Sequence, residues 1–590
     1  MSGWLAVWSH ESGLIDDASW HAASPPSTDY SHHDEYVSPN VRLKTWRRAT
    51  GEFISSGKLI WPHESSCVAW VGQTLDDSGE VTNHAQFLVS INGVSPAMAA
   101  SINGPFAAAV YDQISNQLRV LTDRHRHYPV YFLQKSGLCI ASTRYQSLLP
   151  WIGSLAVNKS AISLLLRCGE CLDTMTVLSD IQMLPSATMI TISDRGVSSN
   201  RYWRMNFEPD FDLDRSQLVD ELAHSMSQSV RRIQTANPRL SVPLSGGLDS
   251  RFILGMCSHP DEINSFTWGD KGCRDISCAE SFASRIGAPH HVEPWQPDTF
   301  PDHWAEGVEL TAGNFGIRDM YVLPYVSLLA RHADVTLNGY AGDALLGGNF
   351  VIRSWLKQQN MEMLANQTWR WRVTKDDDEW ADQLLNDKGA PNGHALWVES
   401  LTKSEGARPI DRLHAWLFEN RVERFTNCGS MLLRSGIETH APFCDNNVID
   451  LLQRVPLELK YKHRLYIDVL KRACPVAAGV PWQRTGIPPS LGYWPNIASM
   501  AFHRGMRIVA GRFGIDPFPA MKVADSASWF RGHWKRPFER IVLSDRSLSR
   551  GLLNPDAMRK AWQAHQDGAD LSRLLGVLIS LELFFEKTLD

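Results

Sequence analysis

The 590-residue sequence contains no apolar run long enough to cross a membrane. Its most apolar late segment, residues 574–585, is interrupted by Glu582 and is shorter than the ~20 residues of a membrane-spanning helix. The N-terminus has too short an apolar run and no basic segment, so it is not typical of a secretory signal peptide. We therefore expect a cytoplasmic protein with no membrane partner, in which residues 574–585 form a buried helix.

Cysteine is scarce and scattered, with ten residues over the whole chain. Only Cys168 and Cys171 have the spacing of a metal-binding or redox pair, and no second pair follows at a distance suited to a zinc site. A disulfide framework and a structural zinc site are therefore disfavoured. We expect reduced, structural cysteines.

Neither sign of charge is in excess. Lys and Arg number 58 against 64 Asp and Glu, which gives a net charge of −6. This balance gives no indication of a nucleic-acid partner or an anionic membrane surface. A content of 43% hydrophobic and 21% charged residues is typical of a folded globular chain, and the length predicts two to four domains rather than one core.

One stretch carries a clear chemical pattern. Residues 240–243 are typical of a buried strand end and residues 251–256 of a helix start, and between them lies Ser-Gly-Gly-Leu-Asp-Ser at positions 245–250. Gly246 and Gly247 let the backbone approach an anion closely, and the helix N-terminus favours negative charge. No lysine follows the glycines, but Asp249 can hold a divalent cation. The pattern predicts Mg-ATP as the ligand.

This loop resembles the pyrophosphate loop of the N-type ATP pyrophosphatases, which cleave ATP between the α and β phosphates and activate a carboxyl group as its adenylate. Strand and helix patterns alternate after it, at residues 264–269, 276–286 and 290–292, as in a parallel sheet covered on both faces. The resemblance implies contacts to ATP from Leu244, Ser245, Gly246, Gly247, Asp249, Ser250 and Trp268.

A second motif, residues 337–348, resembles the Ser-Gly-Glu-Gly-x-Asp motif of asparagine synthetases. Asp343 falls on the family's second magnesium aspartate, so the resemblance implies that Asp249 and Asp343 hold Mg²⁺ on the phosphates. Asn338 and Gly339 belong to the ATP-binding residues in the same comparison. Residues 441–445 match a later run of the family, Pro-Phe-Leu-Asp.

Residues 1–208 show short alternating runs broken by turns, which are typical of antiparallel sheets. Residues 103–112, 121–131 and 140–144 resemble the glutaminase domain of asparagine synthetases, in which the pair Asp123-Arg124 precedes a strand that begins with proline and an aromatic residue. The predicted fold class is therefore α+β and α/β. It consists of a glutaminase-like, Ntn-type antiparallel β-sandwich in residues 1–208, followed by a doubly wound, parallel-sheet ATP pyrophosphatase domain with helical additions in residues 209–590.

The first domain departs from that family at the position that matters most. Its glutaminases use a cysteine directly after the initiator methionine as nucleophile and base, whereas this chain has Ser2 and its first cysteine is Cys67. A hydroxyl is a weaker nucleophile than a thiolate unless a base activates it. We expect no glutaminase activity.

Tyr340 marks a second departure. Asparagine synthetases carry glutamate here, whereas β-lactam synthetases carry tyrosine, which works with a glutamate to take the proton from an attacking amine. The resemblance implies this role for Tyr340 with Glu423, or with Glu438 as the alternative partner; packing beneath the nucleotide is the other interpretation of Tyr340. Arg484 takes the place of a pyrophosphate-binding lysine and could stabilise the departing pyrophosphate.

Extra segments at residues 351–415 and over the last hundred residues resemble the lasso peptide cyclases. That resemblance implies an AMP-forming, ATP-dependent carbon–nitrogen ligase that joins an Asp or Glu side chain of a precursor (core) peptide to its N-terminal amine, closing a macrolactam, with a leader peptidase as partner. The alternatives are a β-lactam synthetase-like or asparagine synthetase-like ligase and, from another class, an inactive scaffold or regulatory protein. The presence of both Asp249 and Asp343 argues against the last.

Overall fold

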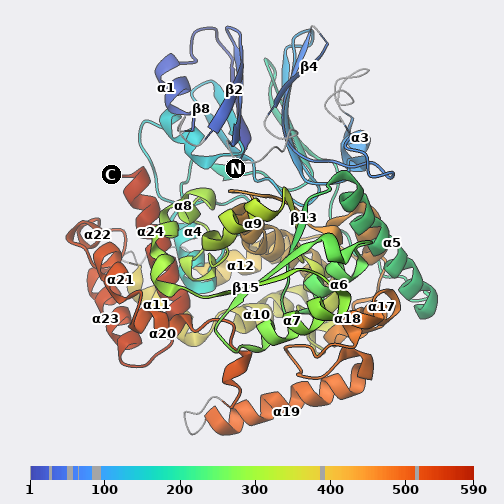
Figure 1. Ribbon diagram of the computed structural model, residues 1–590. Coiled ribbons are helices and arrows are strands. Elements are labelled where there is room, and N and C mark those ends of the chain that lie inside the picture. The colour runs from blue at the N-terminus through green and yellow to red at the C-terminus, as the bar shows by residue number, and fades with distance from the viewer. Residues whose placement is uncertain are drawn as a thin grey trace.

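The computed structural model describes residues 2–25, 30–48, 58–63, 65–82, 95–385, 392–511 and 517–590. Figure 1 shows two sheets in the upper half of the molecule, above a third sheet that is surrounded by helices. The predicted fold class is confirmed: an N-terminal domain of antiparallel sheets is followed by a parallel-sheet domain with many helices.

The first domain contains two six-stranded antiparallel sheets that pack face to face. Small and aromatic side chains fill the space between them, and the Trp4 indole donates a hydrogen bond across it to the Ala107 carbonyl at 3.0 Å. In spatial order, one sheet consists of β10 (Gln182–Met183), β8 (Tyr131–Lys135), β9 (Leu138–Ser142), β1 (Gly3–Ser9), β3 (Val41–Arg48) and β2 (Tyr30–Val37). The other consists of β12 (Gly196–Arg201), β11 (Thr188–Ser193), β7 (Gln117–Thr122), β6 (Phe106–Asp112), β5 (Ser66–Gly72) and β4 (Lys58–His63).

The second domain is built on a parallel sheet of five strands. Their spatial order is β15 (His290–Pro294), β14 (Asn264–Gly269), β13 (Leu240–Pro243), β16 (Val335–Leu337) and β17 (Glu438–His440). The chain therefore runs outward from β13 to β15, returns, and adds β16 and β17 on the opposite side of β13. In such sheets, ligands bind at the carboxyl ends of the strands where the order reverses, which here is between β13 and β16.

Helices cover both faces of this sheet, since Val242 of β13 packs into one apolar cluster and Phe266 of β14 into another. The α-helices described within residues 1–350 are α1 (Asp17–Ala22), α3 (Pro96–Ser101), α4 (Lys159–Cys168), α5 (Arg215–Ala236), α6 (Leu248–Met256), α7 (Arg274–Ile286), α8 (Pro301–Leu310) and α9 (Val326–His332). Later come α10 (Met361–Arg372), α11 (Lys375–Leu384), α12 (Gly393–Thr402), α13 (Pro409–Leu417), α14 (Asn427–Leu433), α15 (Asn446–Gln453), α16 (Leu457–Lys460), α17 (Arg464–Ala473) and α18 (Pro475–Ala478).

The last hundred residues add α19 (Tyr493–Gly511), which stands away from the body in Figure 1, and a cluster that ends in the buried helix α24. The cluster comprises α20 (Ser526–Arg531), α21 (Lys535–Val542), α22 (Asp545–Ser549), α23 (Pro555–Gln566) and α24 (Ser572–Thr588). Residues 574–585 thus lie in a buried helix, as predicted. Within the described ranges, no helix has the length and hydropathy needed to span a membrane.

Candidate active site

Two loops meet where the strand order reverses. The loop after β13 leads into α6, and the loop after β16 leads into the short helical segment η6 (Asp343–Gly347). Because β13 and β16 are adjacent strands, the loops touch: a Cβ atom on Gly339 would lie 2.6 Å from Asp249 Cβ, and one on Gly342 would lie 2.7 Å from Asp249 Oδ1. Such distances are too short for any side chain, so both glycines are needed for this approach.

This contact brings the two predicted metal ligands together. The Tyr466 hydroxyl donates to Asp249 Oδ1 at 2.6 Å, and His463 Nε2 lies 2.9 Å from Asp343 Oδ1. Burial, together with the Asp343 charge, raises the pKa of Asp249 well above its ordinary value. Burial alone would also raise the pKa of Asp343, but the His463 hydrogen bond and the Arg484 charge lower it to about 2.

These two carboxylates suit a magnesium ion that is shared with a nucleotide. Mg²⁺ is typically held by one or two protein carboxylates plus phosphate oxygens and water. The described residues contain no cluster of three or more potential metal-binding side chains that would suit a metal held by protein alone. Burial and the Asp343 charge raise the pKa of Asp249, and the Tyr466 hydrogen bond and the Arg484 charge offset this only in part. A divalent cation would supply the remaining compensation.

The pyrophosphate loop is held in shape by its own serines and by one buried arginine. The Ser245 amide donates to Ser250 Oγ at 2.9 Å, and the Gly247 amide donates to Ser245 Oγ at 3.1 Å. Arg251 is fully buried, and its guanidinium donates to the carbonyls of Gly246 at 2.6 Å and Gly247 at 2.8 Å. A third bond, to the Val480 carbonyl, ties the loop to residues 477–481.

Replacing Arg251 with methionine is expected to destabilise the protein by about 3–5 kcal/mol, because several buried carbonyl groups would lose their donor. The loop should also bind ATP less tightly. Urea denaturation and ATP titration measure the two effects. Arg285→Met is the matched control, because the exposed Arg285 donates to a carbonyl of the same region, that of Gly479; equal losses of stability in both variants would contradict the special role of Arg251.

The remaining predicted ATP-binding residues surround these loops. Leu244 has a buried side chain, so it can meet a ligand only through its backbone. Trp268 stacks on Tyr325 with ring centroids 5.5 Å apart. The Asn338 side chain is fully used within the protein, since it donates to Ser430 and Thr439 and accepts from the Tyr340 amide at 2.9 Å. Asn338 therefore fixes the turn that presents Gly339 and Tyr340.

Arg484 lies at the carboxylate pair. Its guanidinium is 3.4 Å from Asp343 Oδ2, donates to Asn349 Oδ1 at 3.2 Å, and packs over the Trp482 ring. Its side chain is 39% exposed, so one face remains open to a ligand. This position suits a cation that contacts phosphate oxygens next to the metal ligands. His463, its close neighbour at Asp343, was not predicted, because residues 461–466 carry no recognisable motif.

Tyr340 and Glu423 form a second, drier part of the site. Tyr340 is only 6% exposed and its hydroxyl has no hydrogen-bond partner among the described residues; the same holds for Glu423 Oε2. Burial raises the pKa of Tyr340 well above its ordinary value, and the nearby Cys444 and Glu423 contribute. A buried hydroxyl without a partner, such as that of Tyr340, can form a hydrogen bond with a polar group of a ligand, whereas Glu423 Oε2 already faces Arg126.

Glu438, the alternative partner of Tyr340, already forms hydrogen bonds with other residues. Its carboxylate accepts hydrogen bonds from the Tyr128 hydroxyl at 2.5 Å and from Arg434 Nε at 2.9 Å. Burial opposes its ionisation, but the charges of Arg434 and His440 and the hydrogen bonds from Tyr128 and Arg434 together lower the pKa of Glu438. Glu438 therefore binds the two domains together, and the geometry favours Glu423 as the partner of Tyr340.

The first domain supplies one wall of this drier region. Its segment between β7 and β8 places Arg126 Nη2 3.6 Å from Glu423 Oε2 and the His127 ring edge-on against Tyr340, with centroids 5.8 Å apart. The second domain grips the same segment, since Asn427 donates to the Arg126 carbonyl at 2.7 Å and Arg434 to the His127 carbonyl at 2.8 Å. Sequence reasoning noted this run only as a sign of the fold.

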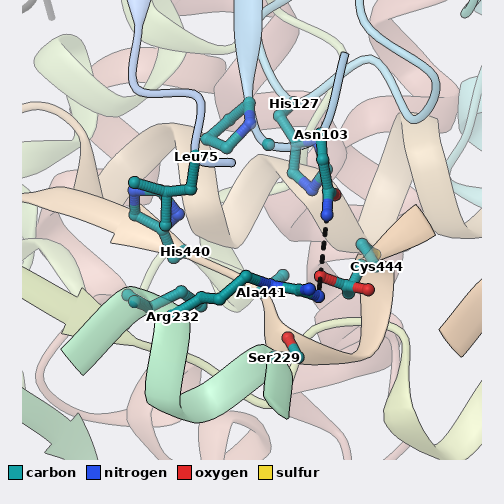
Figure 2. Close-up of a pocket in the computed structure, with 12 residues that line it drawn as sticks. Leu75, Asn103, His127, Ser229, Arg232, His440, Ala441 and Cys444 are labelled. Atoms are coloured by element: carbon teal, nitrogen blue, oxygen red, sulfur yellow. Dashed lines mark hydrogen bonds and ion pairs between the residues drawn. The ribbon is translucent and has the colours of Figure 1, made fainter. Parts of the chain in front are cut away.

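A small cavity lies at this joint, shown in Figure 2. His127 and Asn103 reach it from the first domain, and Ser229 and Arg232 reach it from α5 of the second. Asn103 donates to Asp445 Oδ2 at 2.9 Å, and Arg232 pairs with the same carboxylate. The cavity volume of about 30 Å³ leaves room for little more than a water molecule or two, so it is part of the joint rather than a substrate site.

Burial raises the pKa of Glu423 from 4.5 to about 8; Arg126 and Arg201 oppose this shift and Glu419 adds to it. Between pH 4.5 and about pH 8, the Glu423 carboxyl keeps a proton in the folded protein that it has lost in the unfolded chain. The free energy of unfolding therefore falls as pH rises, by about 1.4 kcal/mol per pH unit at most. The fall ends above about pH 8. In Glu423→Gln this dependence should vanish, as urea denaturation from about pH 5 to 9 would show.

The exposed Glu379, in α11, provides the control for this measurement. Glu379→Gln should keep the pH dependence of the wild type. A Glu423→Gln variant whose stability falls as steeply as that of the wild type between about pH 5 and 8 would show that Glu423 is ionised in the folded protein.

Comparison with known proteins gives one family match in each domain. Residues 221–476 match the asparagine synthase family, and residues 85–203 match the glutamine amidotransferase domain family. Among relatives, glutamine-hydrolysing asparagine synthetases 1 and 3 of Bacillus subtilis (strain 168) are 20% and 23% identical over 450 and 403 residues. These alignments cover 67% and 63% of this chain, and 69% and 64% of the relatives. A probable asparagine synthetase of Acanthamoeba polyphaga mimivirus is 22% identical over 62% of this chain and 58% of its own length.

Proposed function

We propose that this chain, which matches the asparagine synthase family over residues 221–476 and the glutamine amidotransferase domain family over residues 85–203, is an ATP-dependent ligase that closes an amide bond within a single peptide. The family assignment supports an ATP-dependent amide ligase. The choice of an intramolecular peptide reaction rests on Tyr340 and on the helical additions. The observation that carries the proposal is that Tyr340, three residues before Asp343, and the nearby Glu423 are both buried, and that the Tyr340 hydroxyl has no hydrogen-bond partner among the described residues.

The first half-reaction would take place at the carboxylate pair. A side-chain carboxylate of the peptide attacks the α-phosphorus of ATP, which forms an acyl-adenylate and releases pyrophosphate. Arg484 would bind the departing pyrophosphate oxygens. Asp249 and Asp343 are the residues that would hold Mg²⁺, whose charge offsets that of the phosphates when it is bound.

The second half-reaction would use the drier region. The N-terminal amine of the same peptide attacks the acyl carbon, its proton passes to the Tyr340 and Glu423 pair, and AMP leaves. An α-amine has an ordinary pKa of roughly 7.7–8.0, close to the pKa of about 8 of Glu423, so the ionised fraction of Glu423, which grows as pH approaches 8, can accept this proton. The proposed substrate is the core region of a precursor peptide, the product is its macrolactam, and a leader peptidase is the proposed partner in the cytoplasm.

The decisive experiment supplies purified protein with ATP, Mg²⁺ and synthetic linear peptides that have a free N-terminus and one internal Asp or Glu. We expect AMP and pyrophosphate, together with a peptide product that is lighter by one water. ADP and phosphate as products would reject the adenylation step. Conversion of free aspartate and ammonia into asparagine, with no peptide reaction, would instead support an asparagine synthetase.

The first domain is expected to release no glutamate from glutamine, because Ser2 replaces the cysteine nucleophile. The first cysteine, Cys67 in β5, offers no substitute, since burial raises the pKa of its thiol to about 12. A coupled glutamate assay tests this, with a glutamine-hydrolysing asparagine synthetase as the positive control. A glutaminase rate that copurifies with the protein through a further column would overturn the expectation.

A further inference from the structure

A second hollow in the molecule lies outside the site described above. It is a groove between residues 201–208, which connect the two domains, and the helical addition formed by the end of α12, the loop after it and the end of α13. Its volume is about 590 Å³, within the range of roughly 300–1,000 Å³ that is typical of ligand-binding sites. The buried side chains of Met205 and Trp416 line it.

The inner end of the groove adjoins Glu423. There Arg201 pairs with Glu419 at 2.5 Å, and both residues line the groove. Arg201 also donates to Ser186 Oγ at 3.3 Å, and Ser186 in turn hydrogen-bonds to the Glu423 carboxyl group. Glu419 and Glu423 lie on the same short helical segment, η8 (Phe418–Thr426). The ion pair and Ser186 thus link the groove to the proposed proton acceptor.

The groove is lined by both positive and negative side chains, which suits a peptide that carries charges of both signs. Arg201 and Glu419 mark its inner end, and Arg204 and Glu405 form an exposed ion pair, with nitrogen and oxygen 2.9 Å apart, elsewhere along its wall. A free peptide carries an N-terminal ammonium group and side-chain carboxylates, which can exchange partners with such pairs. A nucleotide would need an excess of positive charge, which this groove does not have.

We propose that this groove binds the acyclic peptide substrate, with the N-terminal amine of the peptide at Glu419 and its chain running outward between residues 201–208 and α12. This inference rests on the proposed function, and it specifies where the peptide enters. When the peptide binds, a peptide carboxylate replaces Glu419 as the partner of Arg201. Breaking the Arg201–Glu419 pair gives the peptide access to Glu423. The helical addition at residues 393–417 is then the part of the chain that selects a peptide over a free amino acid.

A thiol-labelling experiment tests the groove directly. All ten native cysteines are free and buried, so an introduced surface cysteine reacts selectively. Ala407→Cys places a thiol on the groove wall, where Ala407 is exposed. Ile114→Cys is the control, because Ile114 is 84% exposed in the turn between β6 and β7 of the first domain. The probe is a synthetic peptide with a free N-terminus and an internal Asp or Glu that is converted in the presence of ATP.

Without ATP no product forms, so the peptide can act only by binding. It is expected to slow maleimide labelling of Ala407→Cys several-fold and to leave labelling of Ile114→Cys unchanged. With ATP, a bulky maleimide on Ala407→Cys should raise the KM for the peptide or abolish its conversion, relative to the same variant before labelling. ATP binding should be retained, and labelled Ile114→Cys should keep its activity.

The outcomes separate the two proposals. Conversion of the peptide with neither protection of the introduced thiol nor inhibition by the label overturns the groove assignment and leaves the proposed function standing. Failure of every such peptide to yield AMP overturns the proposed function, and the groove assignment with it. Protection and inhibition at Ala407→Cys, with neither at Ile114→Cys, support the groove as the peptide site.

Discussion

Asp249→Asn and Asp343→Asn are each expected to reduce formation of AMP and pyrophosphate to the background rate. An asparagine keeps the size of the side chain but loses its negative charge, and these two carboxylates are the groups at the meeting point of the two loops that can hold Mg²⁺. Asp249→Asn should also fold at least as stably as the wild type, because burial and the Asp343 charge disfavour ionisation of Asp249, and a neutral amide of the same size avoids that cost. Loss of activity would then come with no loss of structure.

Pyrophosphate release and thermal unfolding measure the two expectations side by side. Asp334→Asn is the matched control. Asp334 precedes β16, so it lies at the amino ends of the strands, opposite the site, where it pairs with the exposed Arg239. Its activity should be close to that of the wild type. If either active-site asparagine variant retained substantial AMP formation with Mg²⁺ present, the magnesium assignment for that residue would be wrong.

Tyr340→Phe is expected to separate activation from ring closure. The change removes one hydroxyl that has no hydrogen-bond partner in the described part of the chain, and it leaves Asp343, Asp249 and the pyrophosphate loop intact. Pyrophosphate release in the first turnover should therefore persist. Amide formation should slow by at least ~10²-fold, the usual contribution of general acid–base assistance. The adenylate should then accumulate or hydrolyse to the linear peptide.

Rapid-quench measurement of pyrophosphate, with mass spectrometry of the peptide, distinguishes the two steps. Tyr325→Phe is a suitable control, because Tyr325 is another buried tyrosine of the second domain and donates to the Pro294 carbonyl, away from Glu423. Ring closure at the wild-type rate in Tyr340→Phe would reduce Tyr340 to a packing residue. A defect in both steps would instead place its effect on ATP binding.

The parts of the site that the sequence predicted are those in which a backbone requirement leaves a local signature. Gly246 marks the pyrophosphate loop because a Cβ atom there would lie 2.7 Å from Gln483 Cβ, and Gly339 and Gly342 are needed where the second loop meets Asp249. Strand patterns predicted the parallel sheet, and adjacency of β13 and β16 then brought Asp249 and Asp343 together. Short-range patterns were sufficient for these features.

Residues that join the site through tertiary packing could not be predicted in this way. His463 and Tyr466 reach Asp343 and Asp249 from a turn and helix more than a hundred residues further along the chain, where no local pattern marks them. Residues 30–37 have the polar and charged composition that is more typical of a surface loop, yet they form β2 at the edge of the first sheet. Hydrogen bonds to β3 outweigh the low strand propensity of its charged residues.

The segment at residues 123–127 bears on how such a chain can evolve. A domain expected to have no glutaminase activity would ordinarily be free to be deleted. Here, truncation of the gene would remove the Arg126 side chain beside Glu423 and the His127 ring beside Tyr340, and it would leave Asn427 and Arg434 without the backbone carbonyls that they bind. Loss of a nucleophile requires one codon change. Loss of this domain, in contrast, would expose the buried region around Tyr340 and Glu423 to water. Selection on the activity of the second domain would therefore preserve the first domain as a structural part, even without a reaction of its own.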